Sequence, residues 1–253
     1  MTKPFILQAQ NITKYYGNQL GCKDVSFELY PGEVLGIVGE SGSGKSTLLN
    51  CVACHTPIDE GELLYQNEPM HSAPASRQRY LARTEWAFVH QNPRDGLRMN
   101  VSAGGNIGER LMATGARHYG QIRKQAEEWI ERVEIDTARL DDKPKTFSGG
   151  MQQRLQIARN LVTKPKLIFM DEPTGGLDVS VQARLLDTLR MLVKELGLAA
   201  IVVTHDLAVV RLLADRMIVM KSGHVVETGL SDQVLDDPQH PYTQLLVSSV
   251  LQT

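Results

Sequence analysis

The amino-acid sequence predicts an α/β fold with a mainly parallel sheet. Val34–Val38 is a continuous apolar run, typical of a buried parallel strand, and a cluster of Gly and Ser residues separates it from a short predicted helix at Ser46–Asn50. Further along, a strand at Leu167–Met170, an amphipathic helix at Val181–Leu196 and a strand at Ala199–Val203 follow one another. Strands that alternate with helices in this way favour parallel pairing through right-handed crossovers.

The other elements fit into this alternation. Residue patterning predicts one more helix at Asp206–Ala214. It also predicts further strands at Phe5–Ala9, Val25–Leu29, Glu62–Gln66, Trp86–His90 and Met217–Met220. The middle of the chain, from about Val101 to Thr146, is helical in character. Its clearest helix is Ile122–Val133, where the apolar residues share one face: Ile122, Ala126, Trp129, Ile130 and Val133. We therefore expect one α/β core that is interrupted by a helical insert.

The charge balance excludes an electrostatic nucleic-acid binder. The chain of 253 residues has 27 Lys and Arg against 29 Asp and Glu, a formal charge of −2. Binding to nucleic acid through phosphate contacts requires a basic excess or stripe, which this composition lacks. The small basic cluster Arg77, Arg79 and Arg83 is better interpreted as a solvated or docking face.

Hydropathy and cysteine content favour a cytoplasmic protein. Apolar stretches such as Leu198–Val203 run about six residues, against the ~20 that a membrane-spanning helix needs. Met1–Pro4 leads into a predicted strand without the apolar region of a signal peptide. The three cysteines offer no disulfide framework, which is typical of a reducing compartment.

A phosphate-binding motif follows the first buried strand. Gly39–Ser46 reads Gly-Glu-Ser-Gly-Ser-Gly-Lys-Ser and fits G-x-x-x-x-G-K-[ST] without a mismatch. Its glycines let several backbone N–H groups point inward, and the following helix adds the partial positive charge of its N-terminus. The Lys45 ammonium reaches the β- and γ-phosphates, and the Ser46 hydroxyl is a hard oxygen ligand for Mg²⁺. We expect the nucleotide to contact Gly39, Glu40, Ser41, Gly42, Ser43, Gly44, Lys45, Ser46 and Thr47.

Polar residues follow three other predicted strands. Asp171 and Glu172 end an apolar strand, where ligands gather in open α/β sheets; Asp171 is a candidate Mg²⁺ ligand and Glu172 the candidate general base. His205 ends the strand before Asp206 and could hydrogen-bond a γ-phosphate. Gln91 follows Trp86–His90 and could contact both the metal and the attacking water.

One more segment establishes a family resemblance. Phe147-Ser148-Gly149-Gly150-Met151-Gln152-Gln153-Arg154 is similar to the Leu-Ser-Gly-Gly-Gln signature of ABC ATPases, and essentially the whole chain resembles their nucleotide-binding domain. The resemblance implies a P-loop NTPase fold with a mainly parallel core sheet, an N-terminal antiparallel β subdomain and an inserted α-helical subdomain. It also implies a single ATP-binding domain over residues 1–253, with the insert at about 95–160.

The resemblance implies roles for particular residues. Tyr16, rather than its neighbour Tyr15, would stack on adenine. Gln91 would couple the metal site to the helical subdomain, and His205 would be the switch histidine. Asp178 would lie in a loop that crosses a dimer interface.

The signature segment implies a dimer. Ser148 would cap the following helix, and Ser148, Gly149 and Gly150 would contact the ATP that the other protomer holds. A homodimer or an ABC heterodimer would then enclose two ATP molecules, with Mg²⁺ held by Ser46, Gln91 and Asp171. Met151 departs from the usual Gln, and Gly175-Gly176 departs from the usual Ser-Ala, which leaves the coupling between the two ATP sites open.

Two segments resemble different branches of the family. Asp237–Leu246 is similar to the end of the oligopeptide and nickel importer ATPases, whereas Gln91–Gly115 departs from them. The combination resembles the ABC proteins of bacterial carbon–phosphorus lyase systems, which break down phosphonates. This implies a soluble partner, the lyase core complex, with a membrane permease as the alternative. A third hypothesis is a scaffold that binds ATP but barely hydrolyses it.

A Cys-x-x-Cys pair, Cys51 and Cys54, does not predict a metal site. It stands alone, whereas structural zinc usually has four ligands, so we interpret both cysteines as buried residues on the helix after the phosphate loop.

Overall fold

The computed structural model describes residues 4–250 and divides into two compact units. Unit 1 consists of Met1–Gln78 and Gly197–Thr253, and unit 2 of Arg79–Leu196. Met1–Lys3, on which the expectation about a signal peptide partly rests, lie outside the described residues.

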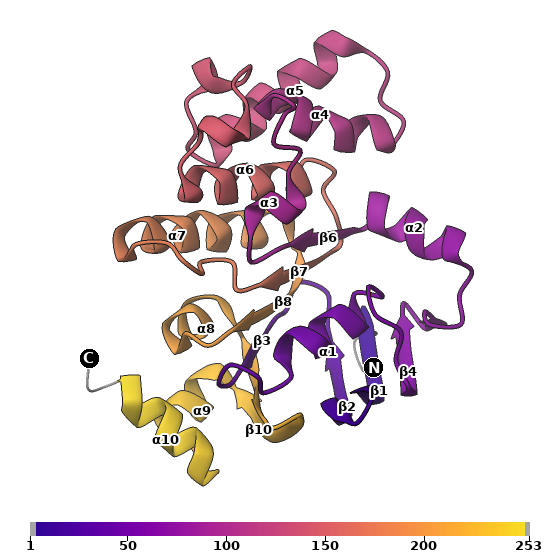
Figure 1. The fold of residues 1–253 in the computed structure, drawn as a ribbon, viewed down its shortest axis with the longest axis vertical. Coiled ribbons are helices and arrows are strands. Elements are labelled where there is room, and N and C mark those ends of the chain that lie inside the picture. Colours follow the sequence, from indigo (N-terminus) through magenta and orange to yellow (C-terminus); the bar gives the residue numbers. More distant parts are fainter. Residues whose placement is uncertain (1–3, 251–253) are drawn as a thin grey trace. The chain divides into compact units, whose positions relative to one another are not determined.

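Unit 1 contains an antiparallel sheet formed near the N-terminus (Figure 1). Its strand order is β2-β1-β4-β5, with β1 at Leu7–Tyr16, β2 at Gln19–Leu29, β4 at Glu60–Tyr65 and β5 at Glu68–Pro69. The first two strands are longer than predicted because bulges let polar residues continue the pairing; Asn11, at φ 51°, lies in one of them. The antiparallel β subdomain that the resemblance implied is confirmed.

Unit 1 also contains the buried parallel strands. β3 (Val34–Val38) pairs in parallel with β8 (Ala199–Thr204) and with β9 (Arg216–Lys221), and β10 (His224–Leu230) pairs with β9 in the antiparallel direction. Every residue of β3 and β8 is buried, as their continuous apolar runs predict. The hairpin strand β10 was not predicted.

The described part of unit 1 contains four complete α-helices. These are α1 (Lys45–Val52), α8 (Leu207–Leu213), α9 (Ser231–Asp236) and α10 (Pro241–Val250). The first two were predicted within two residues, and α9 and α10 were missed because each is short and its polar residues break a clear apolar period. The Asp206 carboxylate accepts a hydrogen bond from the Ala208 amide, so Asp206 is the cap of α8 and not its first residue.

Unit 2 combines two parallel strands with the helical insert. β6 (Trp86–Val89) pairs in parallel with β7 (Leu167–Asp171). The α-helices that follow α2 (Ala75–Thr84), a helix spanning the boundary between the units, are α3 (Pro93–Gly96), α4 (Ala103–Ala113), α5 (Tyr119–Arg132), α6 (Gly149–Leu161) and α7 (Val179–Leu196). Figure 1 shows α6 and α7 side by side, and the predicted apolar face of α5 is buried at Ala126, Trp129 and Ile130. The predicted α/β class, with one antiparallel and one mostly parallel sheet, is confirmed.

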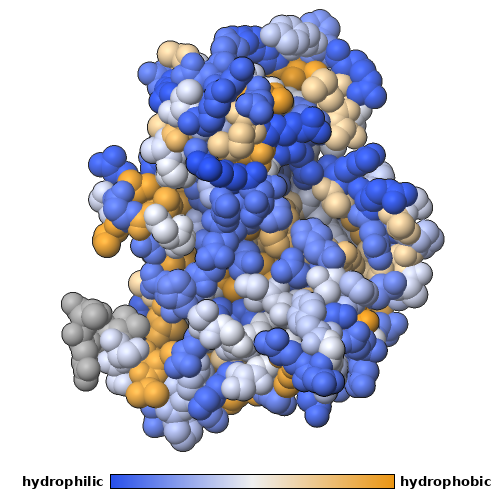
Figure 2. Space-filling view, in the orientation of Figure 1, coloured by the Kyte–Doolittle hydropathy of each residue, from blue (hydrophilic) through white to orange (hydrophobic). Residues whose placement is uncertain are grey.

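The surface in view is mainly hydrophilic, with hydrophobic residues confined to small areas (Figure 2). Within residues 4–250, none of the helices has both the length and the apolar character needed to span a bilayer.

The cysteine prediction needs one correction. Cys51 is buried in α1, but Cys54 lies beyond the last residue of that helix, at φ 56°, and is only half-buried. The helix ends at Val52 because the chain turns back there, with the amides of His55 and Thr56 both donating to the Asn50 carbonyl. Across residues 4–250, no group of three or more His, Cys, Asp or Glu side chains is placed to hold a metal ion.

Candidate functional site

The predicted site residues fall into two groups, one in each unit. Unit 1 contains the phosphate loop, Tyr16 and His205, and unit 2 contains Gln91, Asp171, Glu172, the signature segment and Asp178.

Glycine geometry shapes the phosphate loop. Gly39, Gly42 and Gly44 have φ values of 151°, 80° and 101°, a region that residues with a side chain rarely adopt. A Cβ on Gly39 would lie 2.2 Å from the Met220 carbonyl oxygen, and one on Gly44 would lie 2.2 Å from that of Gly21. The loop is thus pressed between β9 and β2, and only glycine fits at either position.

The Lys45 side chain lies back over this loop. Its ammonium donates hydrogen bonds of 2.8 Å to the carbonyl oxygens of Gly39 and Glu40, and the residue is only 5% exposed. A buried cation held against carbonyl oxygens supplies the charge that a polyphosphate needs, at the N-terminus of α1. Backbone contacts extend the support, because the Gly223 amide donates to the Ser43 carbonyl at 2.9 Å.

Tyr16 lies beside the loop with its ring available. It is 50% exposed at the end of β1, and a Cβ on Gly21 would lie 3.2 Å from its ring. Because Gly21 also touches Gly44, the ring is close to the start of α1. The neighbouring Lys14 ammonium lies 5.8 Å from the Tyr16 ring centre and pairs with Asp59 at 2.9 Å.

His205 follows β8 at the same sheet edge as the phosphate loop. Val38 and Thr204 are paired in the parallel register, so Gly39 and His205 are the next residues on neighbouring strands. The imidazole is exposed. Its backbone position is fixed by the buried Thr204, whose hydroxyl accepts a hydrogen bond from the Asp206 amide at 3.0 Å.

Parallel pairing of neighbouring strands likewise brings Asp171, Glu172 and Gln91 to one sheet edge in unit 2. Val89 pairs with Met170, so the residues that follow, up to Gln91 and Glu172, leave neighbouring parallel strands at one edge. Glu172 has φ 45°, and its carbonyl accepts a hydrogen bond from the Gly175 amide at 2.9 Å, which closes a tight turn. A Cβ on Gly175 would lie 3.6 Å from Glu172 Cβ and 3.7 Å from Gln91 Cγ, so Gly175 lies beside both predicted catalytic side chains.

The turn ends at Asp178, the residue immediately before α7. Its carboxylate accepts hydrogen bonds from the Ser180 hydroxyl at 2.7 Å and from the Val181 amide at 3.0 Å. These two bonds, the first being the stronger influence, lower the pKa of Asp178 below its usual value.

The signature segment forms the N-terminus of α6 as the sequence predicts. The Ser148 hydroxyl accepts a hydrogen bond from the Met151 amide at 3.3 Å, which confirms the predicted cap. Ser148 and Gly149 are exposed. Gly150 is buried, and a Cβ there would lie 2.6 Å from a methyl carbon of Val181 on α7. The packing of α6 against α7 therefore favours glycine at this position.

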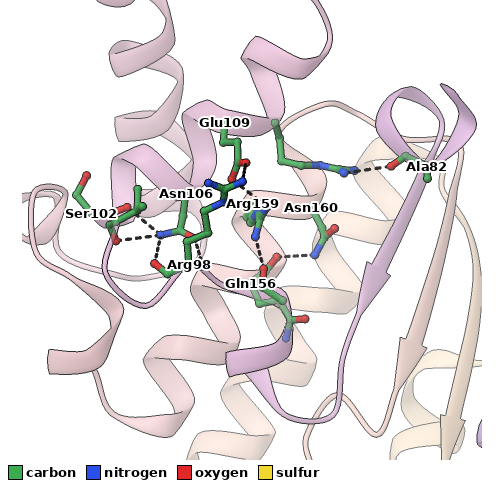
Figure 3. Close-up of polar contacts among 11 residues, drawn as sticks. Ala82, Arg98, Ser102, Asn106, Glu109, Gln156, Arg159 and Asn160 are labelled. Atoms are coloured by element: carbon green, nitrogen blue, oxygen red, sulfur yellow. Dashed lines mark hydrogen bonds and ion pairs between the residues drawn. The ribbon is translucent and has the colours of Figure 1, made fainter. Parts of the chain in front are cut away.

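Buried amide side chains of α6 hold the loop that contains Gln91, a feature that the sequence analysis missed. Gln156 accepts a hydrogen bond from the His90 amide at 2.7 Å and donates one to the His90 carbonyl at 3.1 Å. One turn further along, Asn160 donates to the Phe88 carbonyl at 3.0 Å and to the Gln156 carbonyl at 2.9 Å, the second bond being drawn in Figure 3. The available signal was a run of polar residues on the inner side of a helix, all buried: Gln152, Gln153, Gln156 and Asn160.

Charged residues extend this support into the segment that follows Gln91. The Arg159 guanidinium donates to the Gly96 carbonyl and lies 3.2 Å from the Glu109 carboxylate, which also pairs with Arg98 at 2.6 Å. The fully buried Asn106 accepts from the Arg98 amide at 2.8 Å and donates to its carbonyl at 3.1 Å (Figure 3). The segment 91–115 therefore has a defined shape, built on α4 and α6.

The predicted magnesium ligands have the chemistry that this ion prefers. Ser46, Gln91 and Asp171 offer hydroxyl, amide and carboxylate oxygens, and Mg²⁺ characteristically combines a few such ligands with phosphate oxygens. Ser46 and Gln91 are exposed, and Asp171 is half-buried at the end of β7.

Comparison with known proteins places this arrangement in a family. The family model described as "ABC transporter" matches residues 22–175. The chain is 67% identical over 252 residues, covering all of both proteins, to the putative phosphonates utilization ATP-binding protein PhnK of Escherichia coli (strain K12). It is 37% identical to the dipeptide transport ATP-binding protein DppF of the same organism, over 96% of this chain and 76% of that one.

A solved structure agrees with the sequence relatives. The dimeric post-hydrolysis state of an ATP-binding cassette bound to ADP and Pi superposes with a TM-score of 0.81 and 32% identity, covering 89% of this chain and 98% of that one. The chain belongs to the ABC transporter family, and it is an ATP-binding cassette ATPase.

Proposed function

We propose that this ABC ATPase docks on the carbon–phosphorus lyase core complex in phosphonate catabolism and uses ATP hydrolysis to remodel or reset it. The observation that carries the proposal is the full-length 67% identity to a protein described as taking part in phosphonate utilization. The segment 91–115 supports it, since its departure from peptide importers coincides with the region that Asn106 and Arg159 fix in shape.

The phosphate loop and Tyr16 would carry the nucleotide. Residues 39–47 would surround the phosphates, with Tyr16 against the adenine. Mg²⁺, when bound to Ser46, Gln91 and Asp171, would neutralise charge on the β- and γ-phosphates. Glu172 would accept a proton from the attacking water while His205 holds the γ-phosphate, an in-line arrangement typical of this reaction.

Two copies, or one copy with an ABC partner, would enclose two ATP molecules. Ser148 and Gly149, at the N-terminus of α6, are exposed in this chain, as contact with a nucleotide on another protomer requires. The dimeric state of the ATP-binding cassette bound to ADP and Pi supports this assembly. Loss of the γ-phosphate would remove charge from the interface and let the dimer open.

Purification of the tagged protein tests the proposed partner. Cells that grow on a phosphonate would express the tagged chain, and the companions would be identified in the soluble and membrane fractions with ATP present. We expect soluble lyase subunits, with recovery reduced by Lys45→Ala. Permease subunits from the membrane fraction, without lyase subunits, would instead support the second candidate, an importer motor, which the 37% identity to DppF favours.

Steady-state ATP hydrolysis, measured with and without the lyase core, tests the third hypothesis, that the protein is a scaffold that binds ATP but barely hydrolyses it. We expect turnover that the core complex changes. A chain that binds ATP tightly and shows no turnover under either condition would be a scaffold.

A further inference from the structure

A single peptide group of the phosphate loop is held from two sides. It joins Gly39 to Glu40, and its carbonyl accepts a hydrogen bond of 2.8 Å from the Lys45 ammonium. On the other side its N–H, the Glu40 amide, donates to the Tyr242 hydroxyl oxygen at 3.0 Å. Tyr242 belongs to α10, which is 202 residues away from Glu40 in the sequence.

The position of this tyrosine is tightly determined. Its side chain is only 4% exposed and lies in a buried cluster with Val38, the residue immediately before the loop, and Val219 of β9. The Lys221 ammonium lies 4.7 Å from the ring centre. Burial raises the pKa of Tyr242 above its usual value, so the phenol stays protonated at physiological pH.

The turn before α10 is fixed by its own polar contacts. The Glu227 carboxylate of β10 accepts hydrogen bonds from the Gln239 amide at 2.8 Å and the His240 amide at 3.0 Å. The His240 imidazole in turn accepts from the Tyr242 amide at 3.1 Å. This C-terminal segment therefore brings one hydroxyl to one amide of the loop with little freedom.

The loop cannot easily compensate for the loss of that hydroxyl. Gly39 is pressed against β9, with a Cβ position only 2.2 Å from the Met220 carbonyl oxygen. Its φ of 151° is specific to glycine, so the backbone from which this peptide starts has little room to move. Rotation of this peptide would exchange its carbonyl, which now faces Lys45, with its N–H.

We propose that Tyr242 is a positioning residue for ATP binding: its hydroxyl holds the Gly39–Glu40 peptide in the orientation that presents Lys45 and the loop to the phosphates. The proposal rests on the proposed role of residues 39–47 as the nucleotide site. It makes nucleotide affinity depend on the C-terminal helix, which does not itself contain a phosphate-binding motif.

Tyr242→Phe tests this, because it keeps the buried ring and removes only the hydroxyl. Loss of the one hydrogen bond to the Glu40 amide predicts a rise of about fivefold to tenfold in the Kd for Mg-ADP and in the KM for ATP, with kcat changed by less than about twofold. Tyr30→Phe is the matched control, since the Tyr30 hydroxyl donates to Glu28 in the same unit. We expect Tyr30→Phe to leave both constants unchanged.

Two further measurements separate positioning from a general loss of stability. Hydrogen exchange should accelerate at the Glu40 amide in Tyr242→Phe and not in Tyr30→Phe, and the melting temperature should change equally in the two variants. An unchanged Kd for Tyr242→Phe, or a Kd that rises only in step with a lowered melting temperature, would overturn the inference.

Lys45→Ala distinguishes this failure from failure of the nucleotide site itself. If Lys45→Ala loses Mg-ADP binding while Tyr242→Phe binds normally, the site is correct and the role of Tyr242 is wrong. If Lys45→Ala binds Mg-ADP like the wild type, the assignment of the loop is wrong, and the role of Tyr242 fails with it.

Discussion

Two loops of this molecule leave buried parallel strands in the same way but are held by different means. The phosphate loop after β3 packs closely against other strands because Gly39 and Gly44 have no side chain. Each lies against a backbone carbonyl of another strand, where a Cβ would clash. The Gln91 loop after β6 is held by side chains that are present, chiefly the buried amide of Gln156 on α6.

The difference shows what each loop can do. A loop packed by backbone against backbone has a fixed shape, as a site that recognises phosphate through N–H groups requires. A loop held by hydrogen bonds from one helix moves with that helix. We therefore propose that the Gln91 loop transmits movement between α6, whose N-terminus carries the signature, and the residues that follow Gln91.

The largest effect should come from Glu172, in the turn that packs beside Gln91. Removing a general base costs about 10²-fold to 10⁴-fold in rate, so Glu172→Gln should lose turnover by that factor while its Kd for ATP stays within about threefold of the wild-type value. Steady-state hydrolysis and equilibrium binding measure the two quantities. Glu128→Gln, at an exposed position on α5, is the control and should behave as the wild type.

Size-exclusion chromatography with ATP adds a second readout. Glu172→Gln should accumulate as a closed dimer, since ATP is bound but not hydrolysed. Turnover at the wild-type rate would exclude the general-base role and would leave the turn after β7 with a structural task only.

The next largest effect tests the backbone packing of the phosphate loop. Gly44→Ala places a methyl group 2.2 Å from the Gly21 carbonyl oxygen at φ 101°, so it suffers both a clash and a strained conformation. Gly197→Ala, at φ 61° with no atom within 4 Å, suffers strain alone, about 1–2 kcal/mol. Chemical denaturation should show a clearly larger loss for Gly44→Ala, and equal losses would contradict the close packing.

The sequence predicted the first loop well because its constraint is local. The glycines, Lys45 and the preceding strand lie within one short stretch, and each needs only its own backbone geometry to be recognised. Ser148 was predictable as a cap for the same reason, since its partner, the Met151 amide, is three residues away.

The side chains that hold the second loop, and the contact of Tyr242, were not predictable because their partners are distant in the chain. Gln156 contacts His90 across 66 residues, and a buried glutamine in a helix has many ways to satisfy its amide. Tyr242 was noticed only as part of a C-terminal stretch similar to importers, and no local pattern connects it to Glu40. Periodicity likewise missed β10, α9 and α10, which are short elements stabilised by tertiary contacts.

A moderate effect is expected when the side-chain support of the Gln91 loop is removed. Gln156→Ala removes the hydrogen bonds that this buried side chain makes with the amide and carbonyl of the half-buried His90, which should cost about 1–3 kcal/mol in the free energy of unfolding. Gln78→Ala is the control, because Gln78 is only half-buried and donates to a single carbonyl, that of Met70. Its loss should be smaller.

A double-mutant cycle with Gly96 tests the position of the Gln156 side chain independently. A Cβ on Gly96 would lie 2.3 Å from the Gln156 amide oxygen, so Gly96→Ala should destabilise the wild type through this clash. In the Gln156→Ala background the space is free, and the same substitution should cost less. Additive effects would show that Gln156 does not occupy this position.

The smallest effect is expected for Asp178. Its side chain accepts hydrogen bonds, as Gln156 does at the Gln91 loop, but it lies at the surface. Hydrogen bonds from Ser180 and Val181 lower its pKa, so the ionised carboxylate stabilises the fold above the usual Asp value of 3.8, and this contribution is lost as the pH falls through the lower value in the folded state. Asp178→Ala should therefore lower the urea midpoint slightly at pH 7, and its difference from the wild type should shrink below pH 3.8. Asp187→Ala, at an exposed position on α7, the helix that follows Asp178, supplies the comparison. If the difference in urea midpoint between Asp178→Ala and the wild type is independent of pH, Asp178 acts through its shape rather than its charge. The turn after β7 would then be held by close packing, as the phosphate loop is.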